Sequence, residues 1–458
     1  MENNNHEKQV KEIINEYEEM LEKFINQNSD KNFDEIVNEI KEKFDGKLKE
    51  IAEKKVKEKF EDDDNSNKKK TITCPLCQKK LSPNNKNTPI TIKTVNFPLK
   101  IFRHLYYCRD CTIGIDPAKS IFNIYDGHKL TLNLAEEVVR ESQKLTSFDE
   151  AQKELEHHLG IKVSESVITD ITEEVGDQLH QKELKKANSI IDEYEKHIPD
   201  PDEENKEDCT FYILADGSML SILENEGASW KENKLGMVFK DNKKITRTNG
   251  KNILKEKEYV SYLGSVDSFK NLLFKTAIEN GYGTTKNVVF LGDGAQWIWN
   301  ICEELFPDAV QILDYYHLKE NVYDYGEYLY PNDEKKREKW AENLLDDINE
   351  GNIEKAIDKI PDKIDVENEK KSDIPNLKSY LKNNKNRVNY DEYKKKDYFI
   401  GSGAIESGNK KVIQQRLKQP GMHWAPENCQ GLSTLRTKYC SNQWGKVKKV
   451  IYNNKAVA

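Results

Sequence analysis

Apolar residues are spaced differently in successive parts of the chain, and each spacing predicts a different kind of element. Near the amino terminus they recur every three to four positions among Glu, Lys and Asn, as at Val10, Ile13, Ile14 and Tyr17. This spacing predicts amphipathic helices, which would form either a coiled-coil arm or a solvated charged face. The acidic, Asn-rich and Lys-rich run at residues 61–70 predicts a linker.

Beyond the linker the pattern becomes strand-like and then helical again. Residues 71–115 alternate apolar and polar positions between two cysteine pairs, which predicts a small sheet. Residues 130–185 return to helical spacing. Residues 209–318 interleave strand-like and helix-like segments, and this order predicts an α/β sheet. Residues 318–396 are polar and helical, and residues 401–458 form a separate segment.

The helical region after the small sheet contains a helix-turn-helix candidate. Ser147–Glu150 predicts the cap of a helix that runs to His158. Gly160 predicts a turn, and Ser164–Val167 predicts the start of a second helix. A helix, a short glycine turn and a capped helix are typical of pairs that read DNA. The second helix is acidic, however, so packing or dimerisation explains the pattern equally well.

Composition narrows the class of protein. The 458 residues include 72 basic and 81 acidic side chains, for a formal charge of −9. No apolar run reaches the roughly 18 residues of a membrane-spanning helix, and the amino terminus lacks a signal-peptide core, so we expect a cytoplasmic protein. The acidity is uneven. Residues 68–112 hold ten basic and one acidic residue, and residues 401–458 hold ten basic and two acidic residues, so the overall charge does not exclude nucleic acid.

Four of the eight cysteines form two CxxC pairs, Cys74 with Cys77 and Cys108 with Cys111, separated by 30 residues. A CxxC turn presents two thiolates together, and a structural Zn²⁺ takes four ligands. The long spacer favours a zinc ribbon over a helix-presenting finger. The alternative is four unrelated buried or redox-active thiols. Basic and aromatic residues between the pairs suit phosphate contacts, and Arg103 and Arg109 are candidates for them.

Three carboxylates are candidates for phosphoryl-transfer chemistry. Asp216 and Asp293 each follow an apolar run and precede a glycine, so we expect both at strand ends. Asp-Gly alone is a turn signal, whereas two such sites in one α/β region favour a shared cation. Glu406 falls in the first turn of a predicted helix, where a cap-supporting role is the alternative. Two Asp and one Glu can hold two Mg²⁺ ions for in-line phosphoryl transfer.

Further polar and aromatic residues accompany these carboxylates. Asp314 ends a third apolar run and His317 follows it, so the pair would steady the site, contact the scissile phosphate, or simply close the strand by hydrogen bonding. Trp424 and Trp297 could stack on a base, although each is more typical of a core. Basic residues after Glu406 are candidates for contacts with the phosphates that flank the cleaved bond: Lys410, Lys411, Arg416, Lys418 and Arg436.

Five blocks of the sequence closely resemble the ISKra-type bacterial insertion-sequence transposases. They are ADGSMLSI (215–222), GDGAQWIWN (292–300), ILDYYHLKE (312–320), GSGAIESGNKKVIQQRLKQPGMHW (401–424) and LSTLR (432–436). The resemblance covers roughly residues 70–445. It implies a ribonuclease-H-like core in which Asp216, Asp293 and Glu406 are the Asp-Asp-Glu triad. The Asp314-x-x-His317 spacing resembles a signature of the related mutator-type transposases.

The resemblance therefore implies a DNA transposase that cuts insertion-sequence ends and joins the 3′-hydroxyl to target DNA. It implies Mg²⁺ (or Mn²⁺) at the triad beside Zn²⁺ at the cysteines, double-stranded DNA as partner, nucleoid association and, by analogy, a homodimer or higher homo-oligomer. One alternative is a catalytically silent or domesticated relative that acts as a repressor. Another is a ribonuclease-H-like nuclease or resolvase that does not join strands.

The predicted fold is multidomain α+β. Its expected parts are a helical charged arm and linker (1–67), a zinc ribbon (68–129), a helix-turn-helix-like segment (130–205), the first part of the ribonuclease-H-like core (206–325), a helical insertion (326–398) and the core's carboxy-terminal helix with a basic tail (399–458).

Overall fold

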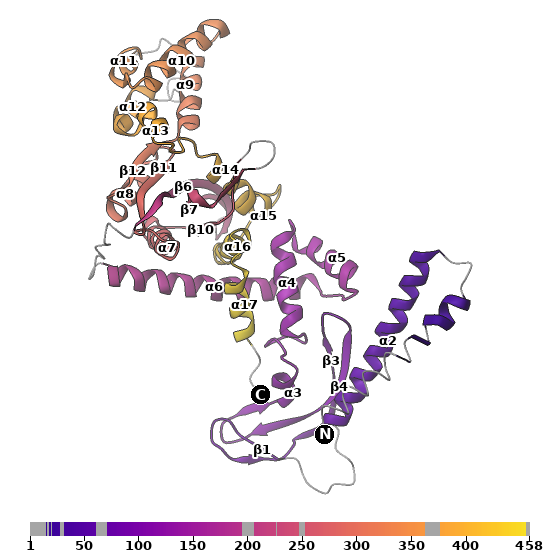
Figure 1. Cartoon of the computed structure of the whole chain (residues 1–458). Coiled ribbons are helices and arrows are strands. Elements are labelled where there is room, and N and C mark those ends of the chain that lie inside the picture. Colours follow the sequence, from indigo (N-terminus) through magenta and orange to yellow (C-terminus); the bar gives the residue numbers. More distant parts are fainter. Residues whose placement is uncertain are drawn as a thin grey trace. The chain divides into compact units, whose positions relative to one another are not determined.

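The computed structural model describes residues 15, 18, 19, 21–27, 32–60, 71–194, 206–225, 227–246, 252–361 and 376–454 (Figure 1). The apolar positions from Val10 to Tyr17 that predict the first helix lie outside the described residues. The chain divides into two compact units. The first contains residues 1–142, 148–171 and 451–458, and the second contains residues 143–147 and 172–450.

The first unit combines a small sheet with helices, as the periodicity predicts. Its strands are β1 (Ile72–Thr73), β2 (Lys80–Leu81), β3 (Asn85–Lys93), β4 (Pro98–Cys108) and β5 (Ile113–Ile115). Strand β1 pairs with β2, and β3, β4 and β5 form an antiparallel sheet in that order. Its helices are α2 (Phe33–Phe60), α3 (Pro117–Ile121), α4 (Leu132–Lys144, which ends in the second unit) and α5 (Phe148–Leu159).

Alternating residues of β3 and β4 build the core of this sheet. Ile90 and Ile92 on β3 pack with Leu99 and Ile101 on β4, all nearly inaccessible to solvent. The intervening positions point outward, which is the period of two expected for a half-buried strand. The predicted helix at Ser147–His158 is confirmed as α5, and Gly160 makes the following turn with a φ of +65°. Helix α6 (Glu165–Tyr194) then begins one residue after Ser164.

The second unit is built on a five-stranded sheet with the order β10-β7-β6-β11-β12. Strands β6, β7 and β10 are antiparallel neighbours, whereas β11 and β12 run parallel to β6. The strands are β6 (Glu207–Glu224), β7 (Gly227–Lys240), β10 (Lys257–Leu263), β11 (Thr285–Gly292) and β12 (Val310–Leu313), and a separate hairpin contains β8 (Lys244–Thr246) and β9 (Asn252–Leu254).

Helices connect and surround this sheet. They are α7 (Val266–Glu279), α8 (Gln296–Leu305), α9 (Tyr315–Leu329), α10 (Glu334–Asn349), α11 (Ile353–Asp358), α12 (Leu377–Asn384), α13 (Tyr390–Lys395), α14 (Gly403–Gly408), α15 (Gln415–Leu417), α16 (Pro426–Cys440) and α17 (Trp444–Asn453). Three shorter turns are η2 (Asp241–Lys243), η4 (Lys385–Arg387) and the π-helical η5 (Asn409–Gln414). Figure 1 shows α9–α13 gathered beyond the β11 and β12 side of the sheet.

Helix α16 covers the open edge of β10. An edge strand leaves backbone groups unpaired, and native proteins pair or cover them. The side chain of Gln430 accepts from the Leu263 backbone N–H at 2.7 Å and donates to the Ser261 carbonyl at 3.3 Å. The Ser441 hydroxyl, one residue past α16, accepts from the Tyr259 N–H at 2.8 Å. These side chains fix the carboxy-terminal helices against the sheet.

The helical insertion predicted for residues 326–398 coincides with the end of α9 and with α10–α13 within the described residues. The Tyr390 hydroxyl donates to the Leu313 carbonyl at 3.0 Å, and Arg387 donates to Gln311 at 2.6 Å, so these helices are anchored to the end of β12. Among the helices that the structure describes, none is both long and apolar enough to cross a bilayer.

Candidate functional site

The carboxylate site begins where the parallel part of the sheet ends. Strands β6 and β11 remain paired as far as Leu214 and Leu291. Asp216 and Asp293 each lie two residues further on, so both follow the same end of the paired strands. Asp293 follows the last residue of β11, as the sequence predicts.

The expectation that Asp216 ends its strand is wrong. Strand β6 continues to Glu224 as one arm of a long hairpin with β7, and Asp216 and Gly217 are paired with Leu235 and Lys234. The Asp-Gly pair makes no turn here because β7 supplies the backbone partners that a turn would otherwise replace. Asp216 therefore sits on a strand that is supported on its β7 side.

Asp216 is held in a crowded, negatively charged environment. Burial, and then the charge of Asp293, raises the pKa of Asp216 to about 6, with a further contribution from Glu406. The side-chain amide of Asn409 and the N–H of Gly217 donate to the Asp216 carboxylate and oppose this rise. Asp293 and Glu406 are thus both near enough to act on the charge of Asp216.

Glu406 reaches this neighbourhood from a different element. It lies in the first turn of α14, and its side chain accepts a hydrogen bond from the Ser402 hydroxyl at 2.8 Å. The three carboxylates do not, however, meet as closely as the cysteines do. Among the described residues, the four cysteines are the group of possible metal ligands whose ligand atoms all lie within 4.8 Å of one another.

Asp314 is a buried capping residue. Only 1 % of its surface is exposed, and its carboxylate accepts from the backbone N–H groups of Tyr316, His317 and Ser402 at 2.7, 3.3 and 3.0 Å. Burial raises the pKa of Asp314, and those three donors oppose the rise. Asp314 therefore ties the start of α9 to Ser402, which in turn holds Glu406.

The Asp314 carboxylate accepts from the backbone N–H of His317 and not from its imidazole ring. The His317 side chain is 44 % exposed, and its Nδ1 lies 3.8 Å from the Glu320 carboxylate. The interpretation that Asp314 steadies the site fits this geometry. A direct phosphate contact by Asp314 does not fit, because its carboxylate is buried and bonded to the backbone.

Three contributing residues escape the sequence pattern. Asn409 follows Glu406 by three residues, at the first position of the π-helical η5, and binds Asp216. π-helical turns inside helices occur often at functional sites. The Tyr380 hydroxyl on α12 donates to the Asp293 carbonyl at 2.7 Å, and Ser402 holds Glu406. The spacing of Asn409 from Glu406, nearly one helical turn, is the one signal that could have identified it.

The backbone conformation at position 294 requires the glycine that follows Asp293. Its φ is +106°, which side chains rarely adopt, and a Cβ at this position would lie 2.6 Å from the Tyr380 ring. The same glycine therefore permits both the sharp turn after β11 and the approach of Tyr380.

The predicted DNA-binding residues of the carboxy-terminal segment divide into exposed and buried groups. Lys410, Lys411 and Lys418 are exposed. Arg416 is only 1 % exposed and stacks over Trp424, with its guanidinium carbon 5.4 Å from the ring centre. Arg436 is 5 % exposed and donates to the carbonyls of Lys411 and Gln143. The expectation of phosphate contacts is therefore wrong for these two arginines, which connect parts of the fold.

The two predicted stacking tryptophans are both partly buried and make packing contacts. The Trp424 indole N–H donates to the Leu417 carbonyl at 2.9 Å, and its backbone pairs with Ser221 and Leu223 of β6. Trp297 makes an edge contact with Phe269, with ring centres 5.7 Å apart. The core alternative for both residues fits these contacts better than base stacking does.

The four cysteines of the first unit meet as predicted. The Sγ atoms of Cys77 and Cys108 are 3.6 Å apart, and those of Cys74 and Cys111 are 3.9 Å apart. A tetrahedral zinc site with Zn–S bonds of about 2.3 Å requires sulfur separations of about 3.8 Å. The cluster could therefore hold a metal ion such as zinc.

The backbone around each cysteine pair follows the same plan. Gln78 and Thr112, which directly follow the second cysteine of each pair, have φ values of 62° and 55°. These left-handed residues turn the chain after each CxxC segment. Hydrogen bonding, with the Cys77 backbone group the largest contribution, lowers the pKa of Cys74 to about 7, which favours a thiolate at this position, whereas hydrogen bonding with Cys77 and burial raise the pKa of Cys111 to about 12.

The two predicted phosphate-binding arginines of the ribbon differ in their surroundings. Arg109 is exposed. Arg103 forms an ion pair with Asp116, and its side chain is 17 % exposed. Arg109 is therefore available to a ligand, whereas Arg103 helps to hold the segment before α3 against β4.

Comparison with known proteins gives a family but no activity. Residues 85–454 match the Uncharacterised protein family (UPF0236). This range contains all three carboxylates and the second cysteine pair, while the first cysteine pair lies before it. A search of curated proteins found no match.

Proposed function

The chain belongs to the Uncharacterised protein family (UPF0236), and we propose that this member is a DNA transposase. In this proposal Asp216, Asp293 and Glu406 hold Mg²⁺ or Mn²⁺, water cuts the end of an insertion sequence, and the freed 3′-hydroxyl attacks target DNA. The observation that carries the proposal is the convergence of three carboxylates from separate parts of the chain: burial, and then the charges of Asp293 and Glu406, raise the pKa of Asp216 to about 6.

The topology of the sheet supports this reading. The sheet order β10-β7-β6-β11-β12 combines three antiparallel strands with two parallel ones, and Asp216 lies on the central β6. Asp293 follows the neighbouring parallel strand, and Glu406 comes from a helix after the helical segment α10–α13.

The residues present suit a hard divalent cation. Carboxylate and amide oxygens are the ligands that Mg²⁺ prefers. Asp216 and Asp293 repel each other, and a cation between them would relieve that repulsion. The Oδ1 of Asn409 is buried and has no hydrogen-bond partner among the described residues, so it is an additional oxygen in this neighbourhood. When bound, the metal would activate the attacking oxygen and stabilise the leaving one.

The surrounding residues would organise these carboxylates. Asn409 holds Asp216 through its amide group, and Ser402 holds Glu406 through its hydroxyl. Asp314 fixes Ser402 by accepting from its backbone N–H. Lys410 and Lys411 are exposed on the turns after Glu406, where they would contact phosphates that flank the cleaved bond.

In the first unit, the cysteine cluster would hold Zn²⁺ and stabilise a ribbon that contacts DNA. Exposed basic and aromatic residues such as Arg109, Phe102 and Tyr107 would supply those contacts. The metal would contribute folding free energy, because it would join the two chain segments that carry the cysteine pairs, which the small sheet and the ion pair between Lys79 and Asp110 also link.

The test is a cleavage and joining assay with the full chain and DNA that flanks its gene, in the presence of Mg²⁺. We expect nicking at one element end and joining of the labelled strand to target DNA. Asp293→Asn should abolish both steps. Asp267→Asn is the matched control, because Asp267 is 84 % exposed at the start of α7 and should leave both steps unchanged.

Each alternative predicts a different outcome. Equal nicking by Asp293→Asn would refute the site assignment. Sequence-specific binding without cleavage, in Mg²⁺ and in Mn²⁺, would identify a silent DNA-binding relative. Cleavage without joining would identify a nuclease or resolvase.

A further inference from the structure

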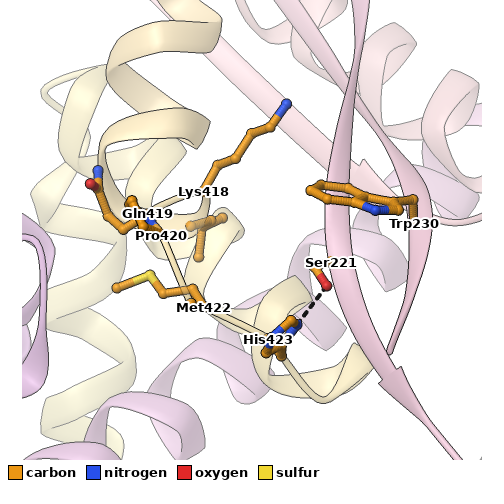
Figure 2. A pocket seen from close by; sticks show the side chains of 9 residues that line it. Ser221, Trp230, Lys418, Gln419, Pro420, Met422 and His423 are labelled. Carbon is orange, nitrogen blue, oxygen red and sulfur yellow. Dashed lines mark hydrogen bonds between the residues drawn. The ribbon is translucent and has the colours of Figure 1, made fainter. Parts of the chain in front are cut away.

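A pocket lies on the hairpin extension of the sheet, away from the three carboxylates. It has a volume of about 340 Å³ and lies between β6 and β7 on one side and residues 417–423 on the other. Ser221 and Trp230, which face each other across the hairpin, form the strand side (Figure 2). Ser221 follows Asp216 by five residues on β6, which corresponds to roughly 17 Å along an extended strand.

The walls of this pocket are fixed by hydrogen bonds. The backbone of Trp424 accepts from Leu223 at 2.8 Å and donates to Ser221 at 3.1 Å, which attaches the 417–423 segment to the edge of β6. Figure 2 shows the hydrogen bond between the Ser221 hydroxyl and Nδ1 of His423, whose atoms are 2.7 Å apart. The pocket is therefore preformed, as small-ligand sites usually are.

Trp230 is the main unexplained feature of the pocket. It is 61 % exposed, although a tryptophan gains free energy from burial. The ammonium group of Lys418 lies 5.8 Å from the centre of its ring. The described residues that line the pocket include no carboxylate, so none of them neutralises the charge of Lys418. An exposed aromatic ring and an uncompensated cation thus share one cavity.

Charge and size favour one class of occupant. Lys418 is exposed and supplies positive charge to the pocket. A ligand that fits this pocket should therefore carry negative charge for Lys418 and also offer a flat ring for Trp230. Nucleic-acid strands offer both, because every unpaired base has a face that stacks on aromatic side chains and every nucleotide carries a phosphate. A volume of about 340 Å³ is at the small end of ligand sites and suits one nucleotide.

We infer that this pocket binds an unpaired nucleotide of a DNA strand, with its base stacked on Trp230 and its phosphate near Lys418. The inference rests on the proposed function, since that function makes DNA the ligand. Apolar neighbours on the same hairpin, Met219 at 43 % and Leu223 at 48 % exposed, would instead suit a second copy of this chain. Dimerisation through this face is therefore a named outcome of the test.

The experiment measures binding of the full chain to a fluorescent 20-nucleotide oligothymidine and to a 20-base-pair duplex, without added Mg²⁺, over a range of salt concentrations. Trp230→Ala should weaken binding of the single strand by roughly five- to a hundredfold, and Trp230→Phe should restore most of it. Lys418→Gln should reduce the slope of log affinity against log salt by about 0.7, the value for one phosphate contact on a single strand. Met219→Ala is the matched control on the same hairpin and should change neither quantity.

Three results would overturn the inference. Unchanged single-strand affinity in Trp230→Ala would show that no base stacks on Trp230. An equal loss on the duplex would show a general DNA surface instead of a site for an unpaired base. A change from dimer to monomer in Trp230→Ala, measured by sedimentation, would identify a second copy as the occupant. If the chain binds single strands through Trp230 but never cuts DNA, the pocket is still a nucleotide site and only the proposed function is refuted.

Discussion

A buried network of charges in the second unit gives the sharpest test of how this fold is held together. Lys438 on α16 lies between two carboxylates, 2.9 Å from Glu258 on β10 and 3.0 Å from Glu183 on α6. Only 3 % of the Lys438 side chain is exposed. Lys275 on α7 adds a second lysine, at 2.5 Å from Glu183. The network therefore joins three helices to the edge of the sheet, and replacing Lys438 with Met removes its central charge.

The size of the effect follows from the two carboxylates. Burial alone would raise their pKa values, but Lys438 and the neighbouring lysines outweigh burial and lower the pKa of Glu183 and of Glu258 to about 2, from 4.5. Each lowering corresponds to about 3 kcal/mol. Lys275 and Lys446 retain part of this stabilisation in the variant. We therefore expect Lys438→Met to reduce the free energy of unfolding by about 3–4 kcal/mol at pH 7, within the usual range for a broken buried pair.

The pH dependence has a definite sign. Because both carboxylates have lower pKa values in the folded chain than in the unfolded chain, their contribution is complete above about pH 4.5 and is lost as the pH falls towards 2. The difference in stability between the wild type and Lys438→Met should therefore be largest at neutral pH. It should shrink as the pH falls from about 5.

Urea unfolding followed by tryptophan fluorescence, at several pH values between 3.5 and 7, measures this difference. Lys446→Met is the matched control, because Lys446 contacts the same Glu258 at 3.2 Å but is 32 % exposed, and should cost about 1 kcal/mol or less. Equal destabilisation of the two variants, or a loss in Lys438→Met that does not depend on pH, would show that the buried charge of Lys438 does not stabilise the fold in this way.

Three further predictions concern the metal sites. Asp216→Asn should stabilise the metal-free chain by about 1–3 kcal/mol at pH 7, because the pKa of Asp216 is raised from 3.8 to about 6; the gain should vanish below pH 4, and urea unfolding would show it. Purified chain should release one equivalent of Zn²⁺ on treatment with a thiol reagent, and Cys108→Ser should lower the zinc content measured by atomic absorption. Ser402→Ala should raise the Mg²⁺ concentration needed for half-maximal cleavage by roughly ten- to a hundredfold, because Glu406 loses its hydroxyl partner; an unchanged requirement would show that Ser402 does not orient Glu406.

Local periodicity and turn chemistry account for much of the fold. The alternation of β3 and β4, the helix at α5 and the turn at Gly160 all follow from patterns a few residues long. The extent of β6 does not, because Asp216-Gly217 has the composition of a turn and only pairing with β7 shows that the strand continues. That pairing is tertiary information, which a local pattern does not contain.

The candidate site shows the same division. A cysteine pair is recognisable because its spacing alone sets the ligand geometry, and the four sulfurs meet as expected. The burial of a basic side chain cannot be recognised from local spacing. Arg416 and Arg436 have the composition of a basic patch, yet one packs on Trp424 and the other binds backbone carbonyls. Tyr380 reaches Asp293 from 87 residues away, a contact that no local spacing signals.

These buried arginines also change the electrostatic argument for DNA. The carboxy-terminal segment has ten basic residues, but Arg416, Arg436 and Lys438 are inaccessible, and Lys446 is paired with Glu258 and Glu279. The positive charge that remains for a ligand is concentrated in fewer side chains, including Lys410, Lys411 and Lys418. Two of these follow Glu406 closely and the third lies beside Trp230. The salt dependence of DNA binding should therefore reflect a few defined phosphate contacts at these two places, and not the formal charge of the segment.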